Sequence, residues 1–203
     1  YLDGFKHFHE FLSKVRTDPD YCKRMIDEIT VNVTEMFRDP SFYTVLRNDI
    51  LPLLGTKPFI RIWHAGCSTG EEVYSMAIML KELGLLHKSI LYATDINAAV
   101  LETAKSGIFP LRMIKDYADN YRDAGGQEDF SDYYIANYGF AKFNEDLSEK
   151  MVFSQHNLVS ESHIDKSGLI NELPNINLRF QFNPTLGFAE MYLNNENIET
   201  NDI

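Results

Sequence analysis

The feature that most constrains the fold is a glycine-containing turn between an apolar run and a helical pattern. FIRIWHA, GCSTGEE and VYSMAIMLKELG follow one another directly over residues 59–84. A second apolar run and a second helical pattern, LYATDI and NAAVLETAKSG, occupy residues 91–107, where Asn97 predicts the helix start and Gly107 its end. Strand, turn, helix, strand and helix at this spacing predict a parallel, right-handed βαβ unit in an α/β fold.

The flanking segments predict further elements. Apolar residues at helical spacing over residues 5–29 predict two short helices, separated at Asp18-Pro19. Asp39 is a candidate helix cap before Pro40, and an amphipathic stripe over residues 42–54 ends at Gly55. Two more strands are expected, MVFSQHNLV (151–159) and NLRFQF (177–182), whereas residues 110–145 predict turns only.

Composition excludes several classes of partner and site. The chain has 203 residues, enough for a medium domain with a small appendage. Its net charge of −11 disfavours binding to nucleic acid or to anionic membranes and is compatible with a cationic ligand. No apolar run approaches the roughly 20 residues of a membrane span. The two cysteines, Cys22 and Cys67, form no CxxC pair, so we expect no metal site and a cytoplasmic protein.

The turn after the first strand is the first candidate for a binding site. Glycines at Gly66 and Gly70 allow a sharp turn and a close approach of the backbone to a ligand. Glu71 and Glu72 begin the helix, so its start suits an amine or a sulfonium better than a phosphate. No Lys-Ser or Lys-Thr follows, which disfavours a P-loop. Alternatively, the two glycines only make a tight connection between strand and helix.

Asp95, at the end of the next strand, is the second candidate. In nucleoside-binding α/β folds an acid at this place accepts hydrogen bonds from ribose hydroxyls. An NAD site is disfavoured because the turn lacks GxGxxG and its acidic helix start would repel a pyrophosphate. Adenosine without phosphate fits better, although an Asp before a helix is more commonly a turn or capping residue.

The segment NVTEMFRD is the third candidate. Asn32, Thr34 and Arg38 alternate with apolar residues before a helix, so two polar side chains could share one face of an extended lid over the pocket. The alternative is a loop with a capping threonine, and the segment alone favours that alternative.

These stretches together resemble a known family. TVNVTEMFRDPSF, RIWHAGCSTGEEVYSMA, YATDIN and FSQHNLV look like the CheR family of chemotaxis protein-glutamate O-methyltransferases, almost without gaps from about Tyr21 to Ser160. The resemblance implies a Rossmann-like methyltransferase sheet that binds S-adenosylmethionine (SAM). It also implies a small N-terminal helical domain, so that residues 1–30 would be a receptor-docking region, 31–58 a connecting segment and 59–203 the methyltransferase domain.

The resemblance also implies roles for individual residues. Asn32, Thr34 and Arg38 would contact SAM, with Arg38 pairing with the ligand carboxylate or orienting the substrate carboxylate as the candidate catalytic residue. Gly66 would let the backbone approach the ligand, Glu72 rather than Glu71 would meet its amine, and Asp95 would hold the ribose. Asn157 and Leu158 would frame the adenine. Candidates for docking on receptor helices are the basic residues of the N-terminal region: Lys6, Lys14, Arg16, Lys23 and Arg24.

The implied activity is transfer of a methyl group from SAM to chemoreceptor glutamates, with S-adenosylhomocysteine as product. A glutamate with a pKa of about 4.3 is ionised at neutral pH and needs no catalytic base. The enzyme has to hold one oxygen in line with the methyl group and exclude water. The absence of a His/Ser or Cys/His pair in the sequence is therefore no objection.

The resemblance stops after about residue 160. The family continues with further strands, the first of which would pair with the FIRIWHA strand, and residues 161–203 are too few to hold them all. We therefore expect an incomplete sheet with an exposed edge. Either NLRFQF covers that edge, or a partner chain does (for example in a dimer), or the sequence omits part of the protein. A catalytically silent module that binds SAM or S-adenosylhomocysteine is the alternative function.

Overall fold

The computed structural model describes residues 4–29, 34–158, 178–183, 188–193 and 196–197. The chain divides into two compact units, Tyr1–Glu161 and Ser162–Ile203. Each unit is described by itself.

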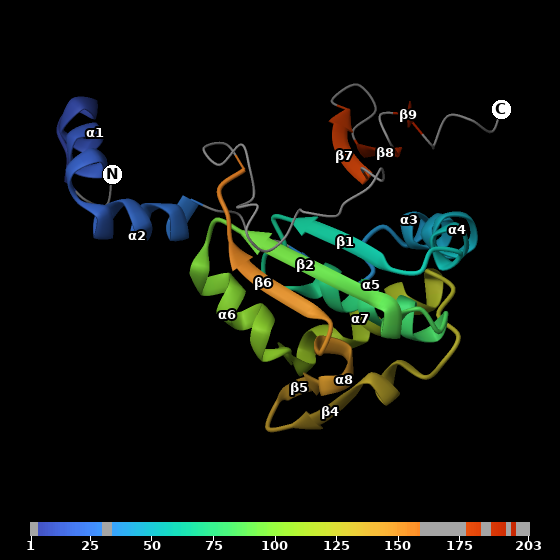
Figure 1. Cartoon of the computed structure of the whole chain (residues 1–203). Helices are drawn as coiled ribbons and strands as arrows, with labels where there is room; N and C mark the ends of the chain where they lie inside the picture. The colour runs from blue at the N-terminus through green and yellow to red at the C-terminus, as the bar shows by residue number, and fades with distance from the viewer. Residues whose placement is uncertain (1–3, 30–33, 159–177, 184–187, 194–195, 198–203) are drawn as a thin grey trace. The chain divides into compact units, whose positions relative to one another are not determined.

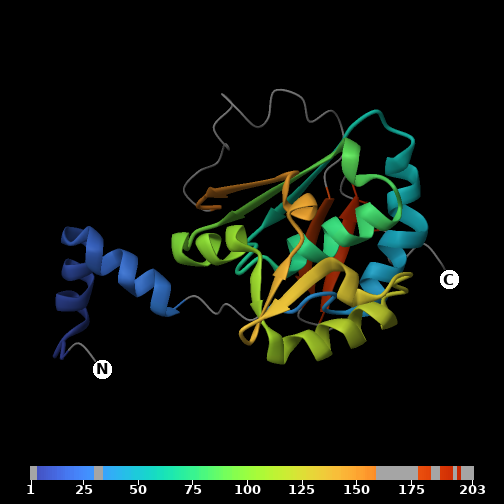
Figure 2. The same ribbon diagram turned by 90° about the horizontal axis from the view of Figure 1, so that it is seen from below.

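A three-stranded parallel sheet forms the centre of the first unit. Its strands are β1 (Ile60–Ala65), β2 (Ser89–Asp95) and β6 (Met151–Gln155), and β2 lies in the middle. Both pairs of strands are parallel. Helices α5 (Glu71–Glu82) and α6 (Ala98–Ser106) follow β1 and β2 and lie on one face of this sheet (Figures 1 and 2). The predicted βαβ unit and α/β class are confirmed.

The two helix ends predicted around α6 are also confirmed. The Asn97 side chain accepts hydrogen bonds from the backbone N–H groups of Ala99 and Val100, which satisfies donors that the helix itself leaves free. Gly107 ends the helix with φ of +61°, a left-handed conformation that favours glycine. The cap thus fixes where α6 begins, directly after Asp95.

Three helical turns precede β1. They are α3 (Pro40–Val45), a π-helical turn η1 (Leu46–Ile50) and α4 (Leu51–Gly55), which ends at the predicted glycine. Asp39 occupies the N-cap position of α3 as predicted. However, it has φ of +57° and its side chain makes no capping hydrogen bond.

Residues 108–148 fold into an insertion that the sequence did not predict. It holds β3 (Ile108–Pro110), helix α7 (Leu111–Asp123), β4 (Tyr134–Asn137) and β5 (Phe140–Phe143), and the strands form an antiparallel sheet in the order β3-β5-β4. The insertion also holds the short elements η3 (Phe130–Tyr133) and α8 (Glu145–Ser148). A further short element, η2 (Leu86–Lys88), lies between α5 and β2.

A buried ion pair lies at the far end of α5. The Arg47 guanidinium is 2.5 Å from a carboxylate oxygen of Glu82, and the Glu82 side chain is only 2% exposed. Glu82 also accepts hydrogen bonds from the hydroxyls of Tyr121 and Tyr133 and from the backbone N–H of Gln127. This cluster joins η1, α5 and the insertion.

The N-terminal region forms the two helices that the sequence predicted, α1 (Phe8–Thr17) and α2 (Pro19–Ile29). The Asp18 side chain caps α2 by accepting from the backbone N–H of Tyr21 at 3.0 Å. The rings of Phe5, Phe11 and Tyr21 meet edge to face, which gives this helix pair a small apolar contact of its own.

Strand β1 pairs only with β2 among the residues that the structure describes, so its other edge carries no strand there. The second unit contains β7 (Leu178–Asn183), β8 (Phe188–Leu193) and β9 (Glu196–Asn197) in an antiparallel sheet of their own. The part of NLRFQF that the structure describes, from Leu178, is therefore a strand, as predicted, and within its own unit it pairs with β8.

Within the described part of the chain, no helix is long and apolar enough to cross a bilayer.

Candidate functional site

The candidate site lies where β1 and β2 end. The backbone N–H groups of Gly66 and Cys67 both donate to the carbonyl of Thr94, at 2.7 and 2.9 Å. The N–H of Ser68 donates to a carboxylate oxygen of Asp95 at 2.9 Å. The turn after β1 and the acid at the end of β2, the first two candidates from the sequence, therefore lie in contact with each other.

The two glycines of this turn are required for different structural reasons. Gly66 has φ of +80°, and a Cβ built there would meet no atom within 4 Å, so it would project into open space. Gly70 has φ of +96°, and a Cβ there would lie 2.8 Å from the Cβ of Ala104. Gly70 thus lets α5 start in close contact with α6, while Gly66 leaves room beside the backbone for a ligand.

The neighbouring glutamates Glu71 and Glu72 have different environments. Glu71 is buried, and its carboxylate accepts from the hydroxyls of Thr69 at 2.6 Å and Tyr117 at 3.3 Å. Burial raises the pKa of Glu71 despite these hydrogen bonds. The Glu72 side chain is 53% exposed, and one of its oxygens lies 2.6 Å from Nδ1 of His64. Glu72 is therefore the glutamate available to a ligand.

The pKa of Glu72 reflects two opposing effects. Desolvation raises it, but the hydrogen bond from His64 and the electrostatic interaction with that ring outweigh this and hold the pKa below its usual range. The carboxylate is consequently ionised at neutral pH, which suits a cationic partner.

Three carboxylates surround the thiol of Cys67. Burial raises the pKa of this thiol to about 12, and the charges of Asp95, Glu72 and Glu71 contribute in that order. The thiol stays protonated at neutral pH and is a poor nucleophile. The turn is therefore a place of concentrated negative charge without a nucleophile at its centre.

Both oxygens of Asp95 already accept one backbone hydrogen bond, from Ser68 and from Asn97, each at 2.9 Å. The hydrogen bond from the backbone N–H of Asn97 is a local contact within the turn, as expected if Asp95 is only a turn or capping residue. A carboxylate has about four lone-pair sites, so acceptor capacity remains for two further donors. Both roles are compatible with this geometry.

The segment before α3 is fixed against the sheet domain. The backbone N–H of Phe37 donates to the Ser75 hydroxyl of α5 at 2.9 Å, and the Asn120 side chain of α7 donates to the carbonyl of Met36 at 3.1 Å. Met36 and Phe37 are fully buried. Because Ser75 lies one turn after Glu71, this anchoring holds the segment near the start of α5.

The other predicted site residues lie on the flanking segments. Thr34 is half-buried and Arg38 is exposed. Asn32 lies outside the described residues. Asn157 is half-buried and Leu158 is exposed, and both follow β6, at the same edge of the sheet as Asp95. The roles of these residues remain predictions.

Two further residues at this turn, His64 and Ser68, were not predicted from the sequence to have a role. His64 is a titratable residue on the same face of β1 as Ile60 and Ile62. This alternation along the strand is the signal that could have identified it. Apart from atoms of the Arg47–Glu82 pair, the buried side-chain polar atoms without a hydrogen bond in the described residues are His64 Nε2 and Ser68 Oγ. Both lie at this turn.

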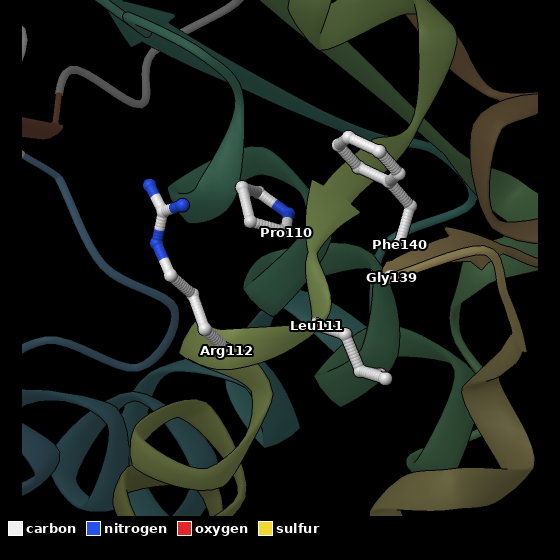
Figure 3. A pocket seen from close by; sticks show the side chains of 5 residues that line it. All are labelled: Pro110, Leu111, Arg112, Gly139 and Phe140. Atoms are coloured by element: carbon white, nitrogen blue, oxygen red, sulfur yellow. The ribbon is translucent and has the colours of Figure 1, made fainter.

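A depression of about 450 Å³ lies elsewhere, on the small antiparallel sheet. Figure 3 shows Arg112 and Phe140 on opposite sides of Pro110, with Leu111 at the start of α7. Arg112 is the one ionisable side chain in this lining, so the depression offers less chemistry than the turn after β1. No group of three or more potential metal ligands occurs in the described residues.

Comparison with known proteins gives consistent results. The sequence model described as "CheR methyltransferase, SAM binding domain" matches residues 32–171. "Putative methyltransferase Cher3" of Pseudomonas putida is 46% identical over 158 residues, which cover 78% of this chain and 58% of that protein.

Several other relatives are named for chemotaxis. A "Chemotaxis protein methyltransferase" of Borreliella burgdorferi is 39% identical over 54% of this chain and 43% of its own length. "Chemotaxis protein methyltransferase 2" of Pseudomonas aeruginosa is 30% identical over 75% of this chain and 54% of its own length. The chain spans about half the length of these relatives. The match to the family model and these similarities show that the chain belongs to the CheR methyltransferase family, through its SAM-binding domain.

Proposed function

We propose that this chain binds S-adenosylmethionine where β1 and β2 end and transfers its methyl group to glutamate side chains of chemoreceptors. The observation that carries the proposal is the 2.9 Å hydrogen bond from Ser68 to Asp95, which joins the turn and the acid. The family match and the names of the relatives support the same function.

The residues present fit this ligand. Glu72 offers an ionised, half-exposed carboxylate to the methionine ammonium. Asp95 keeps acceptor capacity for the ribose hydroxyls, and Gly66 leaves open space for a close approach. The unpaired hydroxyl of Ser68 is a further buried polar group that a ligand could satisfy.

Bound S-adenosylmethionine supplies an electrophilic methyl group on a sulfonium. The chain's own residues bind and orient the two reactants. Arg38, whose side chain is exposed, would hold the carboxylate of the ligand or of the substrate glutamate. Asn32 and Thr34 would contact the ligand from the same segment, and Asn157 with Leu158 would frame the adenine. S-adenosylhomocysteine would be the product.

The N-terminal helices would dock on receptor helices. Of the basic residues there, Lys14 pairs with Asp18 at 2.6 Å, and Arg24 lies over the ring of Tyr21 at 5.0 Å. Lys6 and Arg16 are exposed and could meet an acidic partner, whereas the Lys23 side chain lies outside the described residues. Residues 1–30 would thus form the docking region, 31–58 the connection and 59–203 the methyltransferase domain.

Two free cysteines, Cys22 and Cys67, support a reducing compartment, and we place the protein in the cytoplasm. We also propose that two copies can associate along the edge of β1, since β1 has a strand on only one side in the described residues. Sedimentation of the intact chain tests this association, and a monomer at all concentrations contradicts it.

The same edge favours a second candidate function, a silent module that binds S-adenosylmethionine or S-adenosylhomocysteine. In the described residues no strand lies beside β1 on that side, and a sheet of this kind could bind the ligand without completing the substrate side of the site. Transfer of labelled methyl groups to receptor peptides separates the two functions. Binding without transfer supports the silent module.

Calorimetric titration with S-adenosylmethionine and with NAD tests the binding site. We expect binding of the first and none of the second. Asp95→Ala should abolish binding, and Asp95→Asn, which keeps one acceptor oxygen and the shape, should weaken it. Lys105→Ala, an exposed change on α6, is the control. If Asp95→Ala binds S-adenosylmethionine normally, the placement of the ribose is wrong.

A further inference from the structure

His64 lies at the carboxyl end of β1, and its side chain contacts Glu72 in the first turn of α5. Its side chain is 3% exposed, and its Nδ1 is 2.6 Å from Oε1 of Glu72. Since a carboxylate only accepts hydrogen bonds, Nδ1 carries the proton and donates it. The short distance is typical of a hydrogen bond to a charged acceptor.

This contact occupies one oxygen of Glu72 and leaves the other free. No described residue donates a hydrogen bond to Oε2, and the side chain as a whole is half-exposed. A free glutamate side chain samples several rotamers, and this freedom is lost when it binds a ligand. A buried imidazole that holds Oε1 already restricts the side chain in the free protein, so less conformational entropy is lost when the ligand binds. It also fixes the direction of Oε2.

The neighbouring glutamate shows that this arrangement is specific. Glu71 is held by Thr69 and Tyr117, and it is buried, so it has no oxygen turned to solvent. His64 contacts Glu72 alone of the two. Its other ring nitrogen, Nε2, is buried and has no partner in the described residues, so the Glu72 contact is the polar interaction that accounts for a histidine at this position.

We propose that His64 is a positioning residue that orients the Glu72 carboxylate toward the α-ammonium of S-adenosylmethionine. This inference rests on the proposed function. His64 acts through Glu72 and does not touch the ligand. It therefore determines affinity for ligands that carry the amino-acid moiety and not for those that carry adenosine alone.

Two ligands separate this role from a structural one. S-adenosylhomocysteine carries both adenosine and the amino acid, whereas 5′-methylthioadenosine carries adenosine and the thioether only. In the intact chain, His64→Ala should weaken binding of S-adenosylhomocysteine on the order of tenfold, the effect of losing a charged hydrogen bond. Binding of 5′-methylthioadenosine should change less than about twofold.

Three further variants complete the test. His64→Asn places an amide donor near the position of Nδ1 and should restore most of the affinity. Glu72→Gln should reproduce the selective loss, and the double variant His64→Ala with Glu72→Gln should be no weaker than Glu72→Gln alone. His87→Asn, in η2, is the matched histidine control and should leave both affinities unchanged.

The outcomes are distinct. Equal weakening of both ligands by His64→Ala and by His64→Asn shows a structural histidine and overturns the proposal. Unchanged binding of S-adenosylhomocysteine by His64→Ala overturns it as well. A wild-type chain that binds neither ligand contradicts the proposed function itself, and the role of His64 fails with it.

Discussion

The two ends of α5 use the same residue type in opposite ways. Glu82, near the last turn, is 2% exposed and pairs with Arg47, two tyrosine hydroxyls and a backbone N–H. Glu72, in the first turn, is 53% exposed, and among the described residues its one hydrogen-bond partner is His64. The polar contacts of Glu82 all come from groups that hold the fold together, whereas Glu72 keeps a half-exposed carboxylate. The difference separates a stabilising acid from a binding acid in one helix.

The largest expected effect comes from breaking the buried end. Arg47→Met should lower the free energy of unfolding by about 3–5 kcal/mol, because it leaves the Glu82 charge buried without its cation. Urea unfolding followed by the fluorescence of Trp63 measures this. A loss below about 1 kcal/mol would show that the tyrosine hydroxyls alone suffice to stabilise Glu82.

The two glycines give the next effect and test the binding end. Gly70→Ala should lower the free energy of unfolding by about 2–4 kcal/mol. An alanine would be strained at this left-handed φ, and its Cβ would lie 2.8 Å from the Cβ of Ala104. Gly66→Ala should cost about 1 kcal/mol, since only the strain applies there. Thermal unfolding measures both. Calorimetry should show that Gly66→Ala weakens binding of S-adenosylmethionine, and equal stability losses would contradict the distinction.

Exchanging charge for an amide at each end sharpens the comparison. Glu72→Gln should change the free energy of unfolding by less than about 0.5 kcal/mol and weaken S-adenosylmethionine binding about tenfold. Glu82→Gln should do the reverse: it destabilises by about 1.5–3 kcal/mol and leaves the affinity of the folded molecules unchanged. Unfolding and titration of both variants form a matched pair. If Glu72→Gln is the more destabilising variant, the assignment of the two ends is wrong.

The smallest effect is a pair of opposite pH dependences. Burial alone would raise the pKa of Glu82, but the hydrogen bonds from Tyr121 and Arg47 lower it by more, so that the pKa lies below the ordinary value of 4.5. Its contribution to stability is present above pH 4.5 and is lost as the pH falls through the lowered pKa. Burial raises the pKa of Glu71 above 4.5. Ionisation of this buried group therefore lowers the free energy of unfolding as the pH rises from 4.5 through the raised pKa.

The expected measurement is the free energy of unfolding between neutral and acid pH. Relative to wild type, Glu71→Gln should be more stable at neutral pH, and this advantage should shrink as the pH falls. Glu82→Gln should show a disadvantage that shrinks on acidification. The same trend for both variants would contradict the opposite signs.

The central βαβ unit was predictable because its signals are local. Asn97 and Gly107 mark the ends of α6 by their own backbone chemistry, and both were identified from the sequence. Helix α7 was missed although Ile114, Tyr117 and Tyr121 lie at helical spacing and are buried. Tyrosine is amphipathic, so a run with many tyrosines gives no clear period, and strands as short as β3 and β4 cannot show alternation.

The candidate site was predicted in part for a similar reason. Its backbone turn and Asp95 follow from position in the chain. The choice between Glu71 and Glu72 was suggested by resemblance, but their different burial depends on Tyr117, which lies in the unpredicted insertion. His64 is a single residue in a strand, and only the folded geometry shows that it meets Glu72.

The edge of β1 that carries no strand in the described residues also allows pairing at this edge to be measured by hydrogen exchange. In a parallel strand the backbone N–H groups alternate between the two neighbours. In the described sheet, half of those in Ile60–Ala65 lack an acceptor strand. Deuterium uptake at these amides would slow when a strand pairs there, while β6 would be unaffected. Residue-level exchange would therefore show whether a strand pairs with this edge and which amides of β1 it protects.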